Sequence, residues 1–225
     1  MTEPFLSVSE ALAARRSVRA FLPTPVPRAE LEAVFAAALR VPSNCNIQPW
    51  RAYVASGAKK DALRTALLAQ AASGKPPAPD FDWDLRFSGE HRERQFGAAA
   101  ALYEVIGVDR HDRAARQQAM LRNWSFFDAP HAAFFAMPRY LQLVGAVDLG
   151  ILAQTLVLLL AERGIASCLQ GALGLYPAPV RALFELPDDL GILFGMSFGY
   201  ADPAAPANRA CTARVPLTAA VSFVE

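Results

Sequence analysis

Three arginines lie within five positions near the start of the chain, around one serine. The stretch ARRSVRAF places Arg15, Arg16 and Arg19 about Ser17, between apolar flanks. A guanidinium group keeps its charge at any working pH and binds phosphate through two parallel N–H bonds, and a hydroxyl adds a neutral donor. The cluster fits an anion site, with Arg214 as a candidate fourth cation, and it equally fits ordinary surface arginines.

A second polar stretch, VPSNCNIQPW, occupies residues 41–50. Ser43, Asn44, Asn46 and Gln48 stand between prolines, which restrict the shape of a loop. Amide groups combine a donor with an acceptor and therefore suit the edge of a heterocycle. A polar turn in front of a buried tryptophan is the alternative interpretation.

The composition narrows the class of protein. Of the 225 residues 53% are hydrophobic and only 19% are charged, which indicates one domain with a large buried subunit interface. A net charge of +1 argues against nucleic acid as a partner. The sequence has no G-x-G-x-x-G turn, P-loop or G-x-S-x-G elbow, and its cysteines and histidines show no metal-ligand spacing.

Cysteine usage and apolar runs bear on the compartment. Three widely spaced cysteines indicate a reduced, cytoplasmic setting, and Cys168 lies in an apolar segment that favours a core residue over a nucleophile. The first residues have no signal-like apolar run. The most apolar stretch, residues 149–161, is too short to cross a bilayer and predicts a helix buried on all sides, so we expect no membrane partner.

Periodicity and turn residues predict an α+β fold, with a small central mixed sheet flanked by helices and one long buried central helix. Residues 74–90 read as an irregular lid, and Asp80, Asp82 and Asp84 there, like Asp188 and Asp189, read as solvated turn residues. The expected helices are 7–16, 27–41, 58–73, 91–108, 113–124, 145–163 and 177–186, and the expected strands are 51–56, 131–137, 165–171, 191–200 and a terminal strand within 214–225.

Five stretches together resemble one family. RRSVRAF, PSNCNIQPW, GIASCLQGALGLYP, FGMSFGYAD and ARVPL occur in the order found in the FMN-dependent nitroreductase superfamily, and RNWSFFDAP resembles its nitrobenzoate- and nitrobenzene-reductase branch. The resemblance extends from about residue 8 to residue 223. It implies a single nitroreductase-like domain over residues 1–225, with a lid-like excursion at about 74–125, in an intertwined homodimer with FMN at the interface.

The resemblance also implies the contacts to the cofactor. Arg15, Arg16 and Ser17 would bind the phosphate and ribityl end of FMN, Arg19 would lie near the pyrimidine side, and Arg214 would close on the phosphate. The partner subunit would contribute Pro42, Ser43, Asn44 and Asn46. The flavin N5 and dimethylbenzene side would be met by the backbone of Leu169, Gln170 and Gly171.

Two positions depart from the usual family pattern. Many relatives have proline where this chain has Leu169, and a lysine often found two residues before the last arginine is Thr212 here. The first departure would alter the turn near the flavin N5, and the second would lower the affinity for phosphate.

In the family, NAD(P)H delivers hydride to the flavin N5 and leaves, and a nitroaromatic, quinone or similar electron-poor acceptor is then reduced in a ping-pong cycle. The cofactor carries this redox chemistry, so no side chain is expected as acid or base, and no metal is implied. Aromatic residues of the excursion are candidate walls for a planar acceptor, with simple lid packing as the alternative: Phe81, Trp83, Phe87 and Trp124.

Three further functions stay open on the sequence, the third being a phosphate-ester or nucleotide-binding module without flavin. The same FMN fold supports other reductive chemistry, such as dehalogenation or ene reduction, and Asp80, Asp82, Asp84 and Arg86 would suit a zwitterionic substrate. A non-catalytic flavin-binding protein is the second alternative. A flavin that stays oxidised with every nicotinamide donor would favour it.

Overall fold

A four-stranded sheet forms the centre of the molecule in the computed structural model, which describes residues 6–82 and 86–225. The strands are β1 (Arg51–Ser56), β2 (His131–Pro138), β3 (Ala166–Gln170) and β4 (Leu190–Gly199). Their order is β1-β2-β4-β3, and each neighbouring pair is antiparallel. Parallel pairing, expected of a mixed sheet, is limited in the described residues to one isolated bridge between Ser17 and Ser167.

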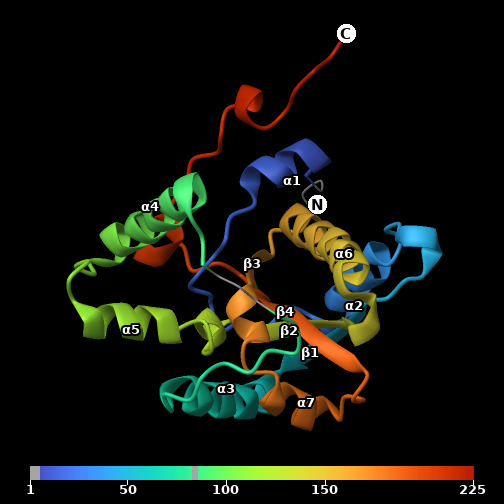
Figure 1. The fold of residues 1–225 in the computed structure, drawn as a ribbon. Coiled ribbons are helices and arrows are strands. Elements are labelled where there is room, and N and C mark those ends of the chain that lie inside the picture. Colours follow the sequence, from blue (N-terminus) through green and yellow to red (C-terminus); the bar gives the residue numbers. More distant parts are fainter. Residues whose placement is uncertain (1–5, 83–85) are drawn as a thin grey trace, which may run out of the picture.

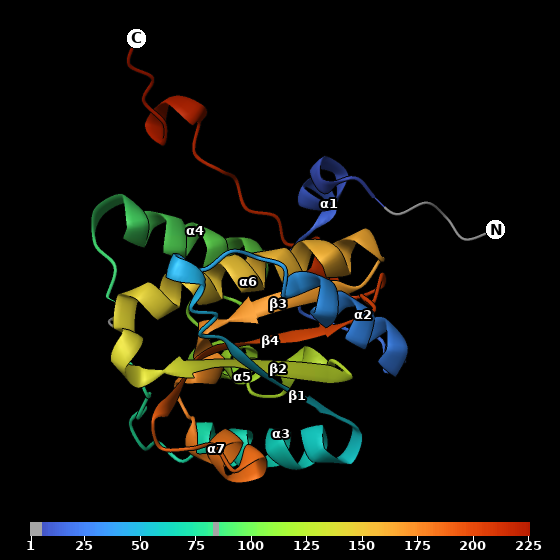
Figure 2. The same cartoon turned by 90° about the vertical axis from the view of Figure 1, so that its right-hand side faces the viewer.

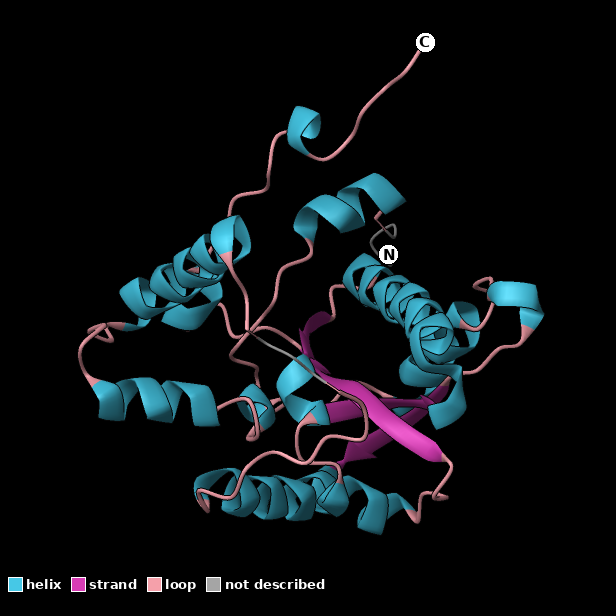
Figure 3. Cartoon of the chain, viewed as in Figure 1, coloured by secondary structure: helices cyan, strands magenta, loops and turns pink. Residues whose placement is uncertain are grey.

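The α-helices of the described residues surround this sheet (Figures 1 and 3). Every predicted helix forms, with its ends shifted by a few residues. Ser7 begins the first one through a capping box, because its hydroxyl accepts the Glu10 N–H while the Glu10 carboxylate accepts the Ser7 N–H. The bounds are α1 Val8–Ala14, α2 Arg28–Ala38, α3 Gly57–Ala72, α4 Gly89–Ile106, α5 Arg113–Leu121, α6 Gln142–Glu162 and α7 Ala178–Phe184.

The sheet is the middle of three layers. Helices α2 and α6 cover one face, and α3 and α7 cover the other (Figure 2). Because successive side chains of a strand point to opposite faces, Phe134 and Phe135 of β2 enter different core clusters, and both are fully buried. Both faces of the sheet are therefore used for the core, and a ligand site must lie at its edges or ends.

Helix α6 is buried along one face only, although the sequence predicts burial on all sides. Leu152 and Leu156 are buried, whereas Leu143 and Val147 are 77% and 57% exposed. With the preceding turn, the helical segment Arg139–Glu162 is longer than the apolar stretch 149–161 read from the sequence, and by length and composition alone it could cross a membrane. Its buried face packs on β2, β3, α1 and α2, as the central helix of a globular core does.

The terminal strand predicted within 214–225 does not form in the single chain. This tail leaves the body of the molecule and contains one short 3-10 turn, Leu217–Ala219 (Figures 1 and 2). A strand needs a neighbour for its N–H and C=O groups, and none of the described strands pairs with the tail. Apolar side chains are exposed along it: Val215, Leu217, Val221, Phe223 and Val224.

The segment 74–125 leaves the sheet and carries α4 and α5 to one side of the molecule (Figure 1). Its first part is anchored, so the expectation of a solvated turn is wrong for Asp80. The Asp80 carboxylate pairs with Arg139 at 2.5 Å and Arg181 at 3.4 Å, and it accepts the Ile192 N–H at 2.9 Å. Because the Asp80 carboxylate is already paired with these internal groups, it is not available to bind the cationic group of a zwitterionic substrate. Asp82 is exposed, and Asp84 lies outside the described residues.

Candidate functional site

The segment after α1 brings the arginine cluster to one cavity. Helix α1 ends at Ala14, and the chain turns extended at the next residue, which serves as the C-cap. The cavity has a volume of about 650 Å³, within the usual range for small-molecule sites. None of its four guanidinium groups pairs with a carboxylate in the described residues. We call it the arginine cavity, and its lining includes Arg15, Arg16, Ser17, Arg19 and Arg214.

Backbone contacts fix this segment against the edge of the sheet. The Val18 N–H donates to the Ser167 carbonyl of β3 at 3.1 Å. The Asn208 side chain accepts the Arg19 N–H at 2.8 Å and donates to the Ala20 carbonyl at 2.8 Å. Asn208 therefore orients the backbone that carries the third arginine. Sequence reasoning assigned it no role, because a lone asparagine 189 positions away gives no local signal.

The side chain of Arg214, the cation near the C-terminal end, is held in place by Thr212. Arg214 Nη1 donates to the Thr212 carbonyl at 3.1 Å and to its hydroxyl at 3.0 Å, and both residues line the cavity. Thr212 stands where the family resemblance led us to expect a lysine. In this chain it orients the remaining guanidinium group and does not add a second charge.

At the end of β3, the polar side chain is buried, so the polar groups that a ligand could contact are those of the main chain. The Gln170 side chain is buried: its amide donates to the Asn123 carbonyl at 2.9 Å, and its oxygen accepts the Ser197 hydroxyl. Leu169 is 41% exposed. The turn Gly171–Gly174 packs directly on β4, since a Cβ at its last residue would lie 2.3 Å from a β4 carbonyl oxygen. Polar contacts from this end would therefore come from main-chain groups, beside the exposed Leu169 side chain.

The loop of residues 42–48 lies elsewhere in the single chain. Its backbone is left-handed at Cys45, Asn46 and Gln48, with φ of 47°, 58° and 45°. Such conformations cost about 1–3 kcal/mol each and mark functional loops. The Ser43 hydroxyl stabilises the loop by accepting the Gln48 N–H at 2.9 Å. None of the four predicted cofactor residues of this loop, from Pro42 to Asn46, lines the arginine cavity.

The four aromatic candidates do not form a common wall. Phe81 and Trp124 are 9% and 5% exposed, and the Trp124 indole donates to the Ala172 carbonyl at 3.1 Å. Both therefore pack in the core of the single chain, which favours the lid-packing alternative, and their assignment to a substrate wall stays a prediction. Phe87 is 45% exposed, and Trp83 lies outside the described residues.

Cys168 is a core residue, as the sequence predicts. It is 3% exposed, and burial raises the pKa of its thiol to about 11, although Arg19 and Ser17 act in the opposite direction. The thiol therefore stays protonated at neutral pH and is a poor nucleophile. Across residues 6–82 and 86–225, no three histidine, cysteine or acidic side chains gather as a metal site.

Comparison with known proteins identifies the family of this chain. The model of the Nitroreductase family matches residues 12–200. The chain belongs to the nitroreductase family. Nitroreductase NfnB of Mycolicibacterium smegmatis is 36% identical over 227 residues, which cover 99% of this chain and 96% of the relative. The 4-nitrobenzoate reductase of Pseudomonas putida is 34% identical, with 99% and 95% covered.

Solved nitroreductase structures share the whole fold. The FMN- and NADPH-dependent nitroreductase NfnB from Sphigopyxis sp. strain HMH is 39% identical with a TM-score of 0.94, covering 98% of this chain and all of that one. The FMN-dependent NfnB from Mycobacterium smegmatis, solved in complex with NADPH, is 37% identical with a TM-score of 0.91, covering 97% and 98%. The nitroreductase-like fold predicted from the five stretches is thus confirmed.

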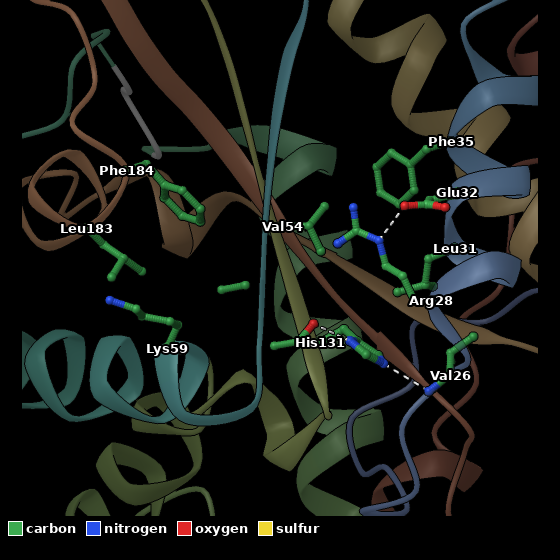
Figure 4. Close-up of a pocket in the computed structure, with 12 residues that line it drawn as sticks. Val26, Arg28, Leu31, Glu32, Phe35, Val54, Lys59, His131, Leu183 and Phe184 are labelled. Atoms are coloured by element: carbon green, nitrogen blue, oxygen red, sulfur yellow. Dashed lines mark hydrogen bonds and ion pairs between the residues drawn. The ribbon is translucent and has the colours of Figure 1, made fainter.

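A second hollow of this nitroreductase straddles the outer side of the edge strand β1 (Figure 4). It has a volume of about 550 Å³. Leu31 and Phe35 of α2 line one side, and Lys59 and Phe184, from α3 and α7, line the other. Val54 of β1 lies between the two sides. We call this hollow the β1 groove.

A buried histidine lies on the floor of the β1 groove. The Val26 N–H donates to His131 Nε2 at 2.9 Å, so Nδ1 carries the ring proton and donates to the Ser56 hydroxyl at 2.6 Å (Figure 4). The ring is 3% exposed and stacks on Phe198. Burial, assisted by the charge of Lys60, lowers the pKa of His131 below its ordinary value.

This histidine should make the fold acid-sensitive. A depressed pKa favours the neutral ring in the folded state, so its stability contribution is present above the unfolded pKa of about 6.5 and declines as the pH falls below it. Once Nε2 is protonated, it is a donor that faces the Val26 N–H donor. The hydrogen bond between them is then lost, at a cost of about 1–3 kcal/mol. We expect the free energy of unfolding, measured by urea titration, to fall between pH 7.5 and 5.

His131→Gln supplies the test, because its side-chain oxygen can accept the Val26 N–H without titrating in this range. The decrease in unfolding free energy should be smaller in this variant than in the wild type. His91→Gln, at an exposed position of α4, is the matched control and should leave the slope unchanged. Equal slopes for wild type and His131→Gln would contradict the prediction.

Proposed function

We propose that this nitroreductase holds FMN in the arginine cavity and uses it to reduce nitroaromatics, quinones or similar electron-poor acceptors with NAD(P)H. The observation that carries the proposal is the convergence of four guanidinium groups, without carboxylate partners in the described residues, on one cavity. Fixed cations around a hollow of about 650 Å³ fit a phosphate dianion with an attached organic group. The relatives described as FMN- and NADPH-dependent support the same assignment.

The donor set divides the roles among the residues. Arg15, Arg16, Ser17 and Arg214 would hold the phosphate and ribityl end, because the first three lie on the extended segment directly after α1 and Arg214 lines the same cavity. Arg19, farther along this extended segment, would face the pyrimidine side of the flavin. A fixed cation there would stabilise negative charge on the ring system. When bound, FMN supplies hydride transfer in both directions.

The protein itself would bind, orient and exclude water, with no side chain as acid or base. The one buried cysteine beside the cluster keeps its proton, as shown above. His131 lines the β1 groove and not the arginine cavity. Phe87 remains a candidate contact for a planar acceptor, because it is the exposed member of the described aromatic set.

We further propose a homodimer with two FMN sites at its interface. An apolar stripe on the outer face of α6 supports this, since its members follow helical spacing and are exposed in the single chain: Leu143, Val144, Val147 and Ile151. The loop of residues 42–48 lies apart from the arginine cavity of its own chain. A second subunit would bring that loop, with Pro42, Ser43, Asn44 and Asn46, to the cofactor of its partner.

The two subunits would be intertwined through their C-terminal tails. Residues 215–224 expose apolar side chains and pair with no described strand, and the β1 groove offers an edge strand flanked by apolar walls. An extended segment that joins a sheet edge satisfies its own main-chain groups and those of the edge. The tail of one subunit would therefore lie in the β1 groove of the other and form there the strand predicted from the sequence.

A cytoplasmic location is proposed on the cysteines. Cys45, Cys168 and Cys211 are all free, and two of them are exposed. Exposed free thiols suit a reducing compartment. The net charge of +1 supports a small-molecule partner over nucleic acid.

The visible spectrum of the purified protein tests the proposed function. A bound flavin band should bleach when NADH or NADPH is added without oxygen, and it should return when a nitroarene or quinone follows. A band that neither nucleotide bleaches would support the non-catalytic flavin-binding alternative. No band after reconstitution with FMN would refute the cofactor assignment.

A further inference from the structure

A carboxylate oxygen without a partner lies beneath the loop of residues 43–48. Asp148 of α6 is 2% exposed, and its Oδ1 accepts the Asn44 N–H at 3.1 Å. Its other oxygen, Oδ2, is buried and has no hydrogen-bond partner in the described part of the chain. A buried carboxylate with a single hydrogen bond destabilises a fold compared with an apolar side chain of the same volume. Core packing alone therefore does not explain an aspartate here.

The bond from Asn44 is what ties this loop to the body of the protein. Among the described residues, it is the one hydrogen bond between residues 43–48 and the rest of the chain. The other bonds are internal: the Asn46 N–H donates to the Ser43 carbonyl at 3.1 Å, and the Gln48 N–H donates to the Ser43 hydroxyl at 2.9 Å. Internal bonds fix the shape of a loop, but they do not fix its direction relative to α6.

We infer that Asp148 is a positioning residue that sets the direction of this loop through the Asn44 amide. The inference rests on the proposed function, in which Ser43, Asn44 and Asn46 reach the FMN of the partner subunit. Asp148 itself touches neither the cofactor nor the acceptor. It lies on the same helix as the apolar stripe, so it couples the loop to the element proposed to form the interface.

The left-handed residues make this tether necessary. Three of the six loop residues hold positive φ, a conformation that an untethered loop would leave readily. Without the carboxylate, the Asn44 N–H loses its acceptor, and the loop can relax away from the geometry that presents its polar groups. The arginine cavity stays intact, because Asp148 does not line it. Flavin binding should therefore weaken without being abolished.

Two substitutions of similar volume separate positioning from packing. Asp148→Leu removes both oxygens and the unpaired charge, whereas Asp148→Asn keeps one oxygen that can accept the Asn44 N–H. We expect Asp148→Leu to raise the Kd for FMN about tenfold, the effect of losing one or two hydrogen bonds. Its melting temperature as apoprotein should equal or exceed that of the wild type. Asp148→Asn should bind FMN within about twofold of the wild type, since its acceptor is retained.

FMN titration of the apoprotein by flavin fluorescence gives the Kd, and sedimentation verifies that the variants keep the oligomeric state of the wild type. Wild-type affinity in Asp148→Leu would overturn the inference. So would an equal loss of affinity in both variants together with lowered melting temperatures, since that pattern belongs to a core residue. Failure of the proposed function is distinguishable, because the wild type would then bind no FMN in the same titration.

Discussion

Alanine at Arg16 or Arg214 should weaken FMN binding about 30-fold, and alanine at both should weaken it about 1000-fold. A hydrogen bond to a charged group contributes about 1.5–3 kcal/mol, and 2 kcal/mol corresponds to about 30-fold in Kd. The two residues line the same cavity and would contact the same phosphate, so about 1000-fold is the product for independent contacts, and a departure from it in the double variant measures the coupling between them. Fluorescence titration of the apoprotein with FMN at fixed ionic strength measures both effects.

Riboflavin makes the assignment to the phosphate specific. The wild type should prefer FMN to riboflavin strongly, and Arg16→Ala/Arg214→Ala should bind the two ligands nearly equally, because the missing contacts act only on the phosphate. Arg16→Lys should lose less than the alanine variant, since it keeps the charge but not the paired N–H geometry. Arg113→Ala, an exposed arginine of α5, is the matched control. Undiminished preference for FMN in the folded double variant would show that the cavity does not hold the phosphate.

Local patterns were enough to predict most elements of the fold. The strands at 51–56 and 131–137 and the helix at 27–41 have periodicities that also satisfy their tertiary environment, so local and global preferences agree. The convergence of Arg214 with the first cluster was different. It is separated from Arg19 by almost the whole chain, so its residue type made it a candidate fourth cation, but spacing alone could not show the convergence that the cavity shows.

Residues that act through distant partners could not be found from the sequence. Asp80 looks like a turn residue in a proline-rich segment, yet it neutralises Arg139 and Arg181 and caps a strand N–H. Asn208 and Asp148 are likewise defined by their hydrogen bonds, three and one respectively, to segments more than 100 positions away. Such pairings depend on topology, and no spacing rule along the chain encodes them.

Two misjudged elements share one physical cause. Helix α6 was expected to be buried on all sides, and the tail was expected to form a strand. In the single chain one face of α6 is exposed, and the tail pairs with no described strand. In the proposed dimer, the apolar composition would reflect the burial of the assembled protein and not that of one subunit. The surplus of exposed apolar side chains on α6 and the tail therefore measures how much of this fold a second copy would complete.

Deletion of residues 217–225 should convert the dimer to a monomer at micromolar concentration and abolish tight FMN binding. The deletion keeps Arg214, so every residue of the arginine cavity remains. It removes the apolar side chains proposed to fill the β1 groove of the partner, including Leu217, Val221 and Phe223. Sedimentation velocity gives the oligomeric state, and FMN titration of the same sample gives the affinity.

Point variants separate the tail from the rest of the interface. Val147→Asp places a charge in the centre of the α6 stripe and should also dissociate the dimer, since a buried unpaired carboxylate costs several kcal/mol. Met120→Asp, at a similarly exposed apolar position of α5, is the matched control and should leave the dimer intact. A truncated protein that stays dimeric would contradict the exchange of tails. A monomer that binds FMN as tightly as the dimer would contradict a cofactor site shared between subunits, because the loop of residues 42–48 would then be dispensable.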